Sequence, residues 1–448
     1  MALSRREVPI LRTRAAHLVR VGRIRMKSDH LLYNSFYLAL TTAAMGVFGF
    51  LFWLLNARLF SATQIGEATL LISATSLISW LSLLGFNNTF IRFLPTATDT
   101  DGQINTGLLL CCGAAIVLGT GYVLLLPVIA PKLTFIRDSP WYAIGFVVLT
   151  ACSAVNLLTD SVFIARREAR YNFLVDGILQ SGTKLSLPLL LVGLGTFGIF
   201  ASAGIAAGLA VVASLILMKR ALGYHPSWRL KLGTLRTAVG FGAASYVSNL
   251  LNLLPLLVLP VIVLDALGAA AAGYYFIAFQ MANLLYAVSY AVTESLLAEG
   301  SHAHTDLRHL SRRSARVLLV LVPPGALLLA VSSHWLLLLF GGGYSRHAAV
   351  TLGVLGLSAL AVAVNVWASA MLKVTRQLHA MVVANVVYAG VIIGTAALLA
   401  PHGLMWVALA WLFGNLAAGA VGCVALAAGR RRPAWDRPAL ALAPVGTT

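Results

Sequence analysis

Residues 273–301 read GYYFIAFQMANLLYAVSYAVTESLLAEGS, an apolar run that nevertheless contains a carboxylate, Glu294. Residues 66–95 read GEATLLISATSLISWLSLLGFNNTFIRFLP and align with this run at an offset of 207 residues, which places Gly66 on Gly273. Polar residues share a phase along the two aligned runs, and the matched pairs are Ser73 with Gln280, Ser76 with Asn283, Ser79 with Tyr286 and Asn87 with Glu294. The sequence therefore predicts that the chain contains two related halves.

The composition indicates a membrane protein. Of the 448 residues 59% are hydrophobic and 10% are charged, whereas soluble domains carry about 25% charged residues. Apolar runs of roughly 20 residues, long enough to cross a hydrocarbon core about 30 Å thick, recur along the whole chain. We predict an all-α polytopic protein with twelve membrane spans, at residues 32–56, 68–93, 104–130, 141–165, 171–194, 196–218, 238–264, 270–299, 314–340, 348–373, 377–399 and 402–428.

The distribution of basic residues predicts the orientation of these spans. The net charge is +18, and of the 32 Lys and Arg residues only Arg58, Lys132, Arg137 and Arg346 fall in the odd-numbered gaps between spans. Because positive residues concentrate on the cytoplasmic side, we expect both termini in the cytoplasm. The basic tail of residues 1–30 is expected to lie against anionic membrane lipids. We therefore do not interpret the net charge as a sign of nucleic-acid binding.

The loops argue against an enzyme. The predicted outer loops are short, and the first of them offers a single carboxylate, Glu67, where a membrane-embedded glycosyltransferase or polymerase needs an acidic catalytic loop. The sequence contains no GxSxG, Walker A or HExxH motif. The four cysteines fall in spans without CxxC spacing, which is typical of packing residues. We expect neither catalysis, nor a cofactor, nor a metal, so that transport or a structural role remains.

The repeat predicts the domain organisation. We expect two six-helix lobes flanked by cytoplasmic segments: a basic tail at 1–30, the N-terminal lobe at 31–218, a linker at 219–237, the C-terminal lobe at 238–428 and a tail at 429–448. Because each lobe has an even number of spans, both lobes enter the membrane from the same side. The pseudo-two-fold axis should then run along the membrane normal.

Polar stripes mark the four spans expected to surround this axis. In span 8, Gln280, Asn283, Tyr290 and Glu294 fall within about 80° of arc at ~100° per residue. Such residues either line a wet cavity between the lobes or join helices to one another; we favour the cavity because Glu294 facing lipid would cost several kcal/mol. The candidate cavity residues are Thr41 and Thr42 in span 1, Ser73, Ser76 and Asn87 in span 2, Ser245, Asn249 and Asn252 in span 7, and Gln280, Asn283, Tyr286 and Tyr290 in span 8.

Three stretches carry a resemblance to a known family. They are GFNNTFIRFLP at 85–95, LRTAVGFGAASYVSNLL at 235–251 and GYYFIAFQMANLLYAV at 273–288. With them the chain resembles the oligosaccharidyl-lipid flippases, the O-antigen and polysaccharide flippases of the MATE-like (MOP) superfamily. The resemblance implies two six-helix lobes around a central cavity lined largely by spans 1, 2, 7 and 8. It also implies alternating access that moves a polyprenyl-pyrophosphate-linked saccharide from the cytoplasmic to the outer leaflet.

Opposite charges occupy equivalent positions of the two halves and are candidates for gates. At the offset of 207, Arg92 falls on Glu299 at the predicted inner mouth, and Arg58 falls on Asp265 at the outer mouth. Residues related by the two-fold axis can approach each other across it. We therefore expect each pair to help close one mouth.

Other ionisable residues in the spans are candidates for coupling. Glu294 lies deeper than Glu299 and is a candidate carrier of a coupling proton or sodium ion. Lys184 is the deepest cation and a candidate for a function within the membrane. Asp160 and Asp176 flank a basic loop and either snorkel towards its arginines or take part in gating or coupling.

With this resemblance, we interpret the chain as a flippase for lipid-linked oligosaccharides in the bacterial inner or plasma membrane. We expect it to serve cell-surface polysaccharide biosynthesis and to work as a monomer beside glycosyltransferases. A cation-coupled exporter of small amphiphiles on the same fold is the alternative, and a scaffold of a cell-wall synthesis complex is a third interpretation. A wet, aromatic cavity with a lipid-sized lateral opening would favour the flippase. A closed cavity centred on one buried carboxylate would favour the exporter.

Overall fold

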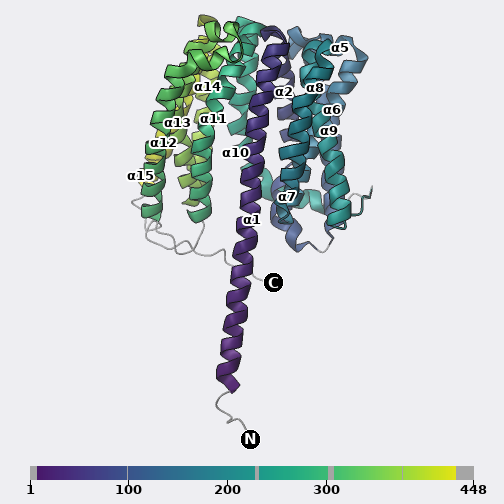
Figure 1. Cartoon of the computed structure of the whole chain (residues 1–448), viewed down its shortest axis with the longest axis vertical. Coiled ribbons are helices and arrows are strands. Elements are labelled where there is room, and N and C mark those ends of the chain that lie inside the picture. The colour runs from purple at the N-terminus through teal and green to yellow at the C-terminus, as the bar shows by residue number, and fades with distance from the viewer. Residues whose placement is uncertain (1–7, 98, 228–231, 301–306, 376, 430–448) are drawn as a thin grey trace.

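The computed structural model describes residues 8–97, 99–227, 232–300, 307–375 and 377–429, and every regular element within these ranges is a helix (Figure 1). Eleven described stretches are long and apolar enough to span a membrane. One of them, Ala169–Ala221, has 53 residues, enough for two crossings: the segmented helical stretch Ala169–Leu191 is followed by the helix Gly195–Ala221. The described chain therefore agrees with the twelve spans expected from the sequence.

The N-terminal lobe is the purple-to-teal half of Figure 1. Its elements are α1 (Val8–Leu59), α2 (Ala62–Ser82), α3 (Phe86–Phe93), η1 (Leu94–Thr96), α4 (Thr100–Ile129), η2 (Pro131–Leu133), α5 (Phe135–Asp138), α6 (Pro140–Ala165), α7 (Ala169–Asn172), η3 (Phe173–Gln180), α8 (Ser181–Leu191), η4 (Val192–Leu194) and α9 (Gly195–Ala221). The first part of α1 projects well beyond the bundle (Figure 1). We call the end from which α1 projects the proximal end, and the opposite end the distal end.

The C-terminal lobe is the green-to-yellow half of Figure 1. It consists of α10 (Leu232–Leu267), α11 (Ala269–Gly300), α12 (Leu307–Leu338), α13 (Gly342–Val374), α14 (Leu378–Leu399), η5 (Ala400–His402) and α15 (Leu404–Gly429). Helix α10 contacts α2 and α3 of the N-terminal lobe as well as α11 and α14 of its own lobe. It therefore runs along the boundary between the lobes.

Two local departures from a regular α-helix shape the N-terminal lobe. The second crossing, expected as one helix over 68–93, is interrupted because Leu84 and Gly85 have positive φ values of 48° and 81°. The fifth crossing contains η3, a π-helix of 8 residues. Such wide turns occur frequently at functional sites because they redirect side chains.

Among the described side chains, the buried apolar cluster that both lobes share lies towards the distal end. The largest cluster includes Leu71 of α2 and Tyr275 of α11, and thus belongs to both lobes. Towards the proximal end, the N-terminal lobe has its own cluster around Phe90, and the C-terminal lobe has a separate one around Met371. Among the described side chains, the lobes therefore share a packed core in the distal half and none at the proximal end.

Candidate functional site

Two glycines bring the lobes together at the distal end. Gly66 of α2 and Gly273 of α11 are buried, and each lies against the backbone of the other's helix. A methyl group on Gly66 would lie 1.9 Å from the carbonyl oxygen of Ala269, and one on Gly273 would lie 2.2 Å from that of Ala62. The offset of 207 relates Gly66 to Gly273 and Ala62 to Ala269, so the contact is symmetric between the two halves. Glycine permits this close approach of two backbones because it has no Cβ atom.

Arg58, near the C-terminal end of α1, connects the lobes at the same end. Its Nε atom donates a hydrogen bond of 3.0 Å to the carbonyl oxygen of Leu339, and its Nη2 atom contacts the carbonyl oxygens of Leu338 and Leu339. Leu338 ends α12, and a cation is favourable beside the unpaired carbonyls of a helix C-terminus. The expected pairing of Arg58 with Asp265 is wrong for this conformation: the ion pairs of the described residues do not include it, because the guanidinium binds α12 instead.

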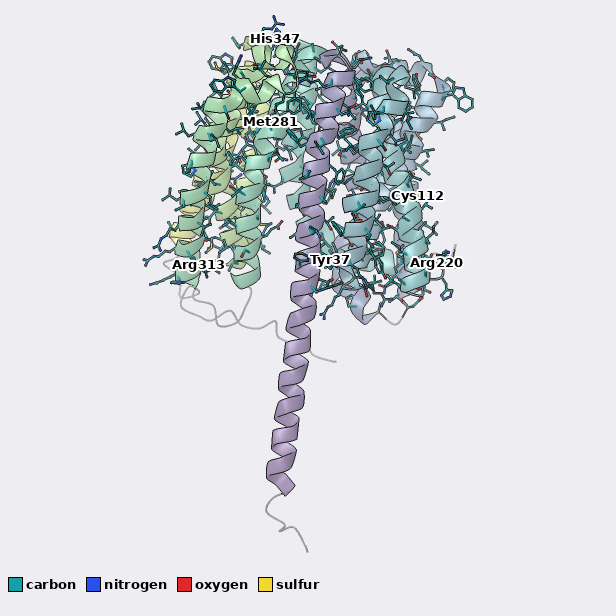
Figure 2. All side chains as sticks on the ribbon, in the orientation of Figure 1. Tyr37, Cys112, Arg220, Met281, Arg313 and His347 are labelled. Carbon is teal, nitrogen blue, oxygen red and sulfur yellow. The ribbon has the colours of Figure 1, made fainter. Side chains whose placement is uncertain are left out.

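A pocket of about 260 Å³ lies between α1 and α11, at the boundary of the lobes. Gly46 and Gly49 leave room on the α1 side, since a methyl group on either would meet nothing within 4 Å. On the distal side, the rings of Trp53 and Phe276 close the gap between the helices with a centroid distance of 4.5 Å. The lining residues are Met45, Gly46, Gly49, Phe50, Trp53, Gln280, Met281, Asn283, Leu284 and Phe340; Met281 is labelled in Figure 2.

Helix α11 has one exposed face and one buried face. Gln280, Asn283, Tyr290 and Glu294 are all exposed or partly exposed, and the first two line the pocket. Tyr286 is different, because it lies outside the ~80° arc of these four residues and faces α13. Its side chain is completely buried, and its phenol donates a hydrogen bond of 2.7 Å to the carbonyl oxygen of Leu355 in α13. The assignment of Tyr286 to the cavity is therefore wrong.

The expected polar residues of spans 1 and 2 lie away from this pocket. Thr41 and Ser73 are buried, Ser76 is partly buried and Thr42 is exposed. The hydroxyls of Thr41, Thr42 and Ser76 donate to carbonyls four residues earlier in their own helices. Asn87 lies on α3, beyond the break in the second crossing, and so does not share a helical face with Ser73 and Ser76 as expected.

Several expected site residues lie outside the described side chains. These are Ser245, Asn249 and Glu299, so the stripe on span 7 and the gate between Arg92 and Glu299 stay predictions. Asn252 of α10 is exposed. Arg92 is exposed at the end of α3, and its guanidinium carbon lies 5.4 Å from the ring centroid of Phe93.

Lys184 of α8 contacts α1 within the N-terminal lobe. Its Nζ atom lies 4.6 Å from the ring centroid of Phe52, a cation–π contact. The ion pairs found among the described residues do not include Lys184. Phe52 is not among the residues that line the pocket between α1 and α11. The structure thus places this cation inside one lobe and not between the two.

Asp160 of α6 and Asp176 of η3 lie together inside the N-terminal lobe. The Nδ2 atom of Asn172, four residues before Asp176, donates a hydrogen bond of 3.4 Å to the backbone carbonyl oxygen of Asp160. The Nδ2 atom of Asn156 donates a hydrogen bond of 3.1 Å to Oδ1 of Asp176. The ion pairs among the described residues do not join either aspartate to a loop arginine, and Arg170 pairs with Glu168 at 2.8 Å.

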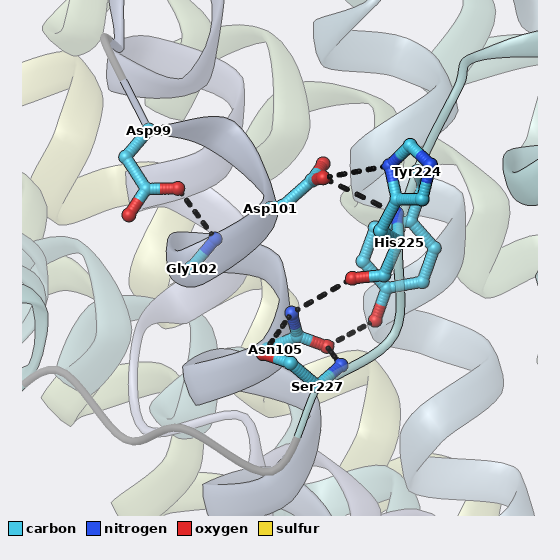
Figure 3. A network of polar contacts seen from close by, with 7 residues as sticks. All are labelled: Asp99, Asp101, Gly102, Asn105, Tyr224, His225 and Ser227. Atoms are coloured by element: carbon cyan, nitrogen blue, oxygen red, sulfur yellow. Dashed lines mark hydrogen bonds and ion pairs between the residues drawn. The ribbon is translucent and has the colours of Figure 1, made fainter.

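A polar network that sequence analysis missed ties the lobe linker to α4 (Figure 3). The Oδ1 atom of Asn105 accepts hydrogen bonds from the phenol of Tyr224 and from the backbone N–H of Ser227. Asp101 accepts from the backbone N–H of His225 at 3.2 Å and lies 3.4 Å from its Nδ1 atom. Burial raises the pKa of Tyr224 to about 12, so its phenol keeps the proton that it donates. No sequence signal reveals this network, because 119 residues separate Asn105 from Tyr224.

Comparison with known proteins identifies the family and the fold. The family model described as polysaccharide biosynthesis protein matches residues 55–349, well over half of the chain. No curated protein matches the chain in sequence.

Solved structures share the fold at low sequence identity. A point mutant of the Vibrio cholerae MATE transporter VcmN has a TM-score of 0.62 and 14% identity, over 91% of this chain and 98% of the other. An inward-facing multidrug resistance MATE transporter of the MOP superfamily has a TM-score of 0.60 and 17% identity, over 88% and 95% of the two chains. A MOP superfamily transporter from Pyrococcus furiosus has a TM-score of 0.59 and 16% identity, over 91% and 96%. This chain therefore has a MATE-like transporter fold.

Proposed function

Because this chain belongs to the polysaccharide biosynthesis protein family and has the fold of the MOP transporters, we propose that it is a flippase for a polyprenyl-pyrophosphate-linked oligosaccharide. The family and the fold are those of membrane transporters and not of enzymes. The cargo moves from the inner to the outer leaflet of a bacterial cell membrane and serves the assembly of a surface polysaccharide. The positive-inside rule supports a cytoplasmic proximal end.

The pocket between α1 and α11 is the observation that carries this proposal. The side-chain amides of Gln280 and Asn283 offer donors and acceptors for sugar hydroxyls. Met45, Phe50 and Trp53, on the opposite wall, offer apolar and aromatic surface. A cargo with a sugar head and an isoprenoid tail has the same division into polar and apolar parts. The pocket also lies between the lobes, where a relative movement of the lobes changes its access.

The contacts that join the lobes at the distal end support a mechanism of alternating access. In this conformation the lobes are joined at the distal end by Gly66, Gly273 and Arg58. Transport requires these contacts to part while the proximal ends approach each other. A coupling ion, H⁺ or Na⁺, supplies the driving force in this proposal. The protein works as a monomer beside the glycosyltransferases that make its cargo.

Export of small amphiphiles is the second candidate function. The pocket volume of about 260 Å³ is slightly below the ~300–1,000 Å³ that is usual for sites that enclose drug-sized ligands. One of the similar solved structures is a multidrug resistance transporter. The two candidates differ in the cargo and not in the fold.

Reconstituted protein distinguishes these candidates. Proteoliposomes carry a fluorescent polyprenyl-pyrophosphate saccharide, and a membrane-impermeant quencher measures its movement between leaflets; a cationic dye is tested in parallel. We expect lipid-linked saccharide movement that falls at least tenfold when Gln280 and Asn283 are both replaced by Leu. A matched replacement, Ser332→Leu at a partly exposed position of α12, should leave the rate unchanged. Dye movement without saccharide movement would refute the flippase and establish the exporter.

A further inference from the structure

We propose that a groove on the outer surface of the C-terminal lobe, between α12, α13 and α15, binds one anionic phospholipid. Arg312 and Arg316 of α12 hold its phosphate, and the groove holds an acyl chain. The groove is separate from the transport pocket between α1 and α11. Lipid binding at this place does not depend on the proposed function.

The groove is apolar along its length. It has a volume of about 440 Å³, and α12 and α15, which both pack against α13, form its walls. Its floor is a stripe of α13 at helical spacing, made by Leu360, Ala363, Val364 and Trp367. The lining contains no carboxylate, amide or hydroxyl side chain. A hydrocarbon chain therefore suits this groove, whereas the hydroxyls of a saccharide would be left without hydrogen bonds.

Trp367 is the most proximal residue of the floor. Its Nε1 atom donates a hydrogen bond of 3.1 Å to Oγ of Ser314 in α12, and this bond joins the floor to one wall. A tryptophan with an apolar ring contact and a paired N–H group is typical of the depth at which lipid headgroups begin. A lipid in the groove would thus have its headgroup at the proximal end.

Two arginines continue the face of α12 that lines the groove. At ~100° per residue, one arc of about 60° contains Arg312, Arg316, Leu319 and Pro323, and the last two line the groove. Both arginines are exposed, and the ion pairs among the described residues include neither of them. They lie towards the proximal end, where Figure 2 labels their neighbour Arg313. Guanidinium groups bind phosphate strongly, and basic pockets between membrane helices bind anionic headgroups.

The N-terminal lobe has an equivalent groove that the chain itself covers. This groove has a volume of about 470 Å³ and lies between α4, α6 and α9. At the offset of 207, its lining residues Asn105 and Leu109 correspond to Arg312 and Arg316. The linker covers its proximal end, because Tyr224 lines the groove and its phenol donates a hydrogen bond to Asn105. Here the chain supplies the polar partner at the rim.

The sequence of the C-terminal half does not supply such a partner. The residues at the same offset from Tyr224 and His225 are Arg431 and Arg432. These have the same charge as the two arginines beside the groove, and like charges repel each other. An anionic group from outside the chain compensates this charge, and the acyl chain attached to it covers the apolar groove.

Lipid binding is measured on the purified full-length chain in neutral detergent, without any lipid-linked cargo. Melting temperatures and native mass spectra are recorded with phosphatidylglycerol, with phosphatidylcholine of the same acyl chains, and with inorganic phosphate. We expect only phosphatidylglycerol to raise the melting temperature and to stay bound as one molecule per chain. Arg312→Gln and Arg316→Gln should each weaken this binding roughly fivefold. The control Arg313→Gln removes the same charge beside a different pocket, between α11 and α12, and should bind as wild type.

A second pair of variants tests the groove itself. Ala315→Trp fills the groove while both arginines remain, and should also weaken the binding of phosphatidylglycerol at least fivefold. Val320→Trp places the same side chain at an exposed position of α12 outside the groove, and should have no effect. Misfolding of a variant is recognised from its melting curve without lipid, and the remaining variants then decide.

Four results would overturn the proposal. Phosphatidylcholine that binds as tightly as phosphatidylglycerol would remove the role of charge, and inorganic phosphate that stabilises equally well would remove the role of the groove. Polyprenyl phosphate that displaces phosphatidylglycerol at equal concentration would make the groove an isoprenoid site. Arginine and groove variants that bind as the wild type does would place the lipid elsewhere. None of these results bears on saccharide movement, which is measured separately.

Discussion

A single methyl group at Gly66 tests whether the glycine contact holds the distal end closed. The Cβ atom of Gly66→Ala would lie 1.9 Å from the carbonyl oxygen of Ala269. Because real Cβ atoms essentially never come within 3.0 Å of another heavy atom, α2 and α11 must separate by more than 1 Å at their crossing. The obstructing atoms belong to the backbone of Ala269 and Gly273, and a helix backbone cannot move aside as a flexible side chain can.

The separation should shift the balance between conformations. Overpacking of a tight contact typically costs about 1–3 kcal/mol, which corresponds to a change of roughly 5- to 150-fold in a two-state population ratio. The distally closed state bears this cost and the distally open state does not. We expect Gly273→Ala to have a similar effect because the contact is symmetric. The double variant should have less than the sum of the two effects, since one separation relieves both contacts.

Spin-label distances measure this shift. Nitroxides attached at Asp138→Cys in the N-terminal lobe and at Arg346→Cys in the C-terminal lobe report the separation at the distal end, in a background without the native cysteines. Gly66→Ala should add a population at longer distance. The control is Gly113→Ala in α4, where a methyl group meets nothing within 4 Å. If Gly66→Ala gives the same distances and melting temperature as Gly113→Ala, the contact does not hold the lobes together.

Three further predictions concern individual side chains. Arg58→Gln should also populate the distally open state, by up to about tenfold, because it removes a charged donor from the end of α12; unchanged spin-label distances would contradict this. Tyr224 contributes stability that is present below its unfolded pKa of about 10 and lost as the pH rises through its folded pKa of about 12. Limited proteolysis of the linker should therefore accelerate over that pH range in the wild type and much less in Tyr224→Phe. Equal acceleration in both proteins would show that the hydrogen bond between Tyr224 and Asn105 is not responsible. Asn283→Cys should react with a water-soluble thiol reagent in at least one transport state, whereas Ala282→Cys, its buried neighbour on α11, should stay protected; protection of both would remove the pocket from the transport path.

The sequence by itself determined the membrane class, the twelve crossings and the exposed stripe of α11. These properties are local or periodic: a span is an apolar run of sufficient length, and Gln280, Asn283, Tyr290 and Glu294 share a face because the helical repeat puts them there. Gly66 and Gly273 were marked as equivalent by the internal offset alone. What the offset could not say is that the two residues touch, because equivalence under a symmetry axis does not fix the distance from that axis.

Tertiary structure alone decided which polar groups meet. Arg58 binds the carbonyls of α12 instead of Asp265, because backbone acceptors at a helix end have no signature in the sequence. Tyr286 turns into the C-terminal lobe, where its phenol donates a hydrogen bond to the carbonyl oxygen of Leu355 in α13. Asp160 and Asp176 are linked to neighbouring asparagines where η3 departs from the α-helical repeat. A change of helical pitch shifts the side-chain directions that a regular periodicity would predict.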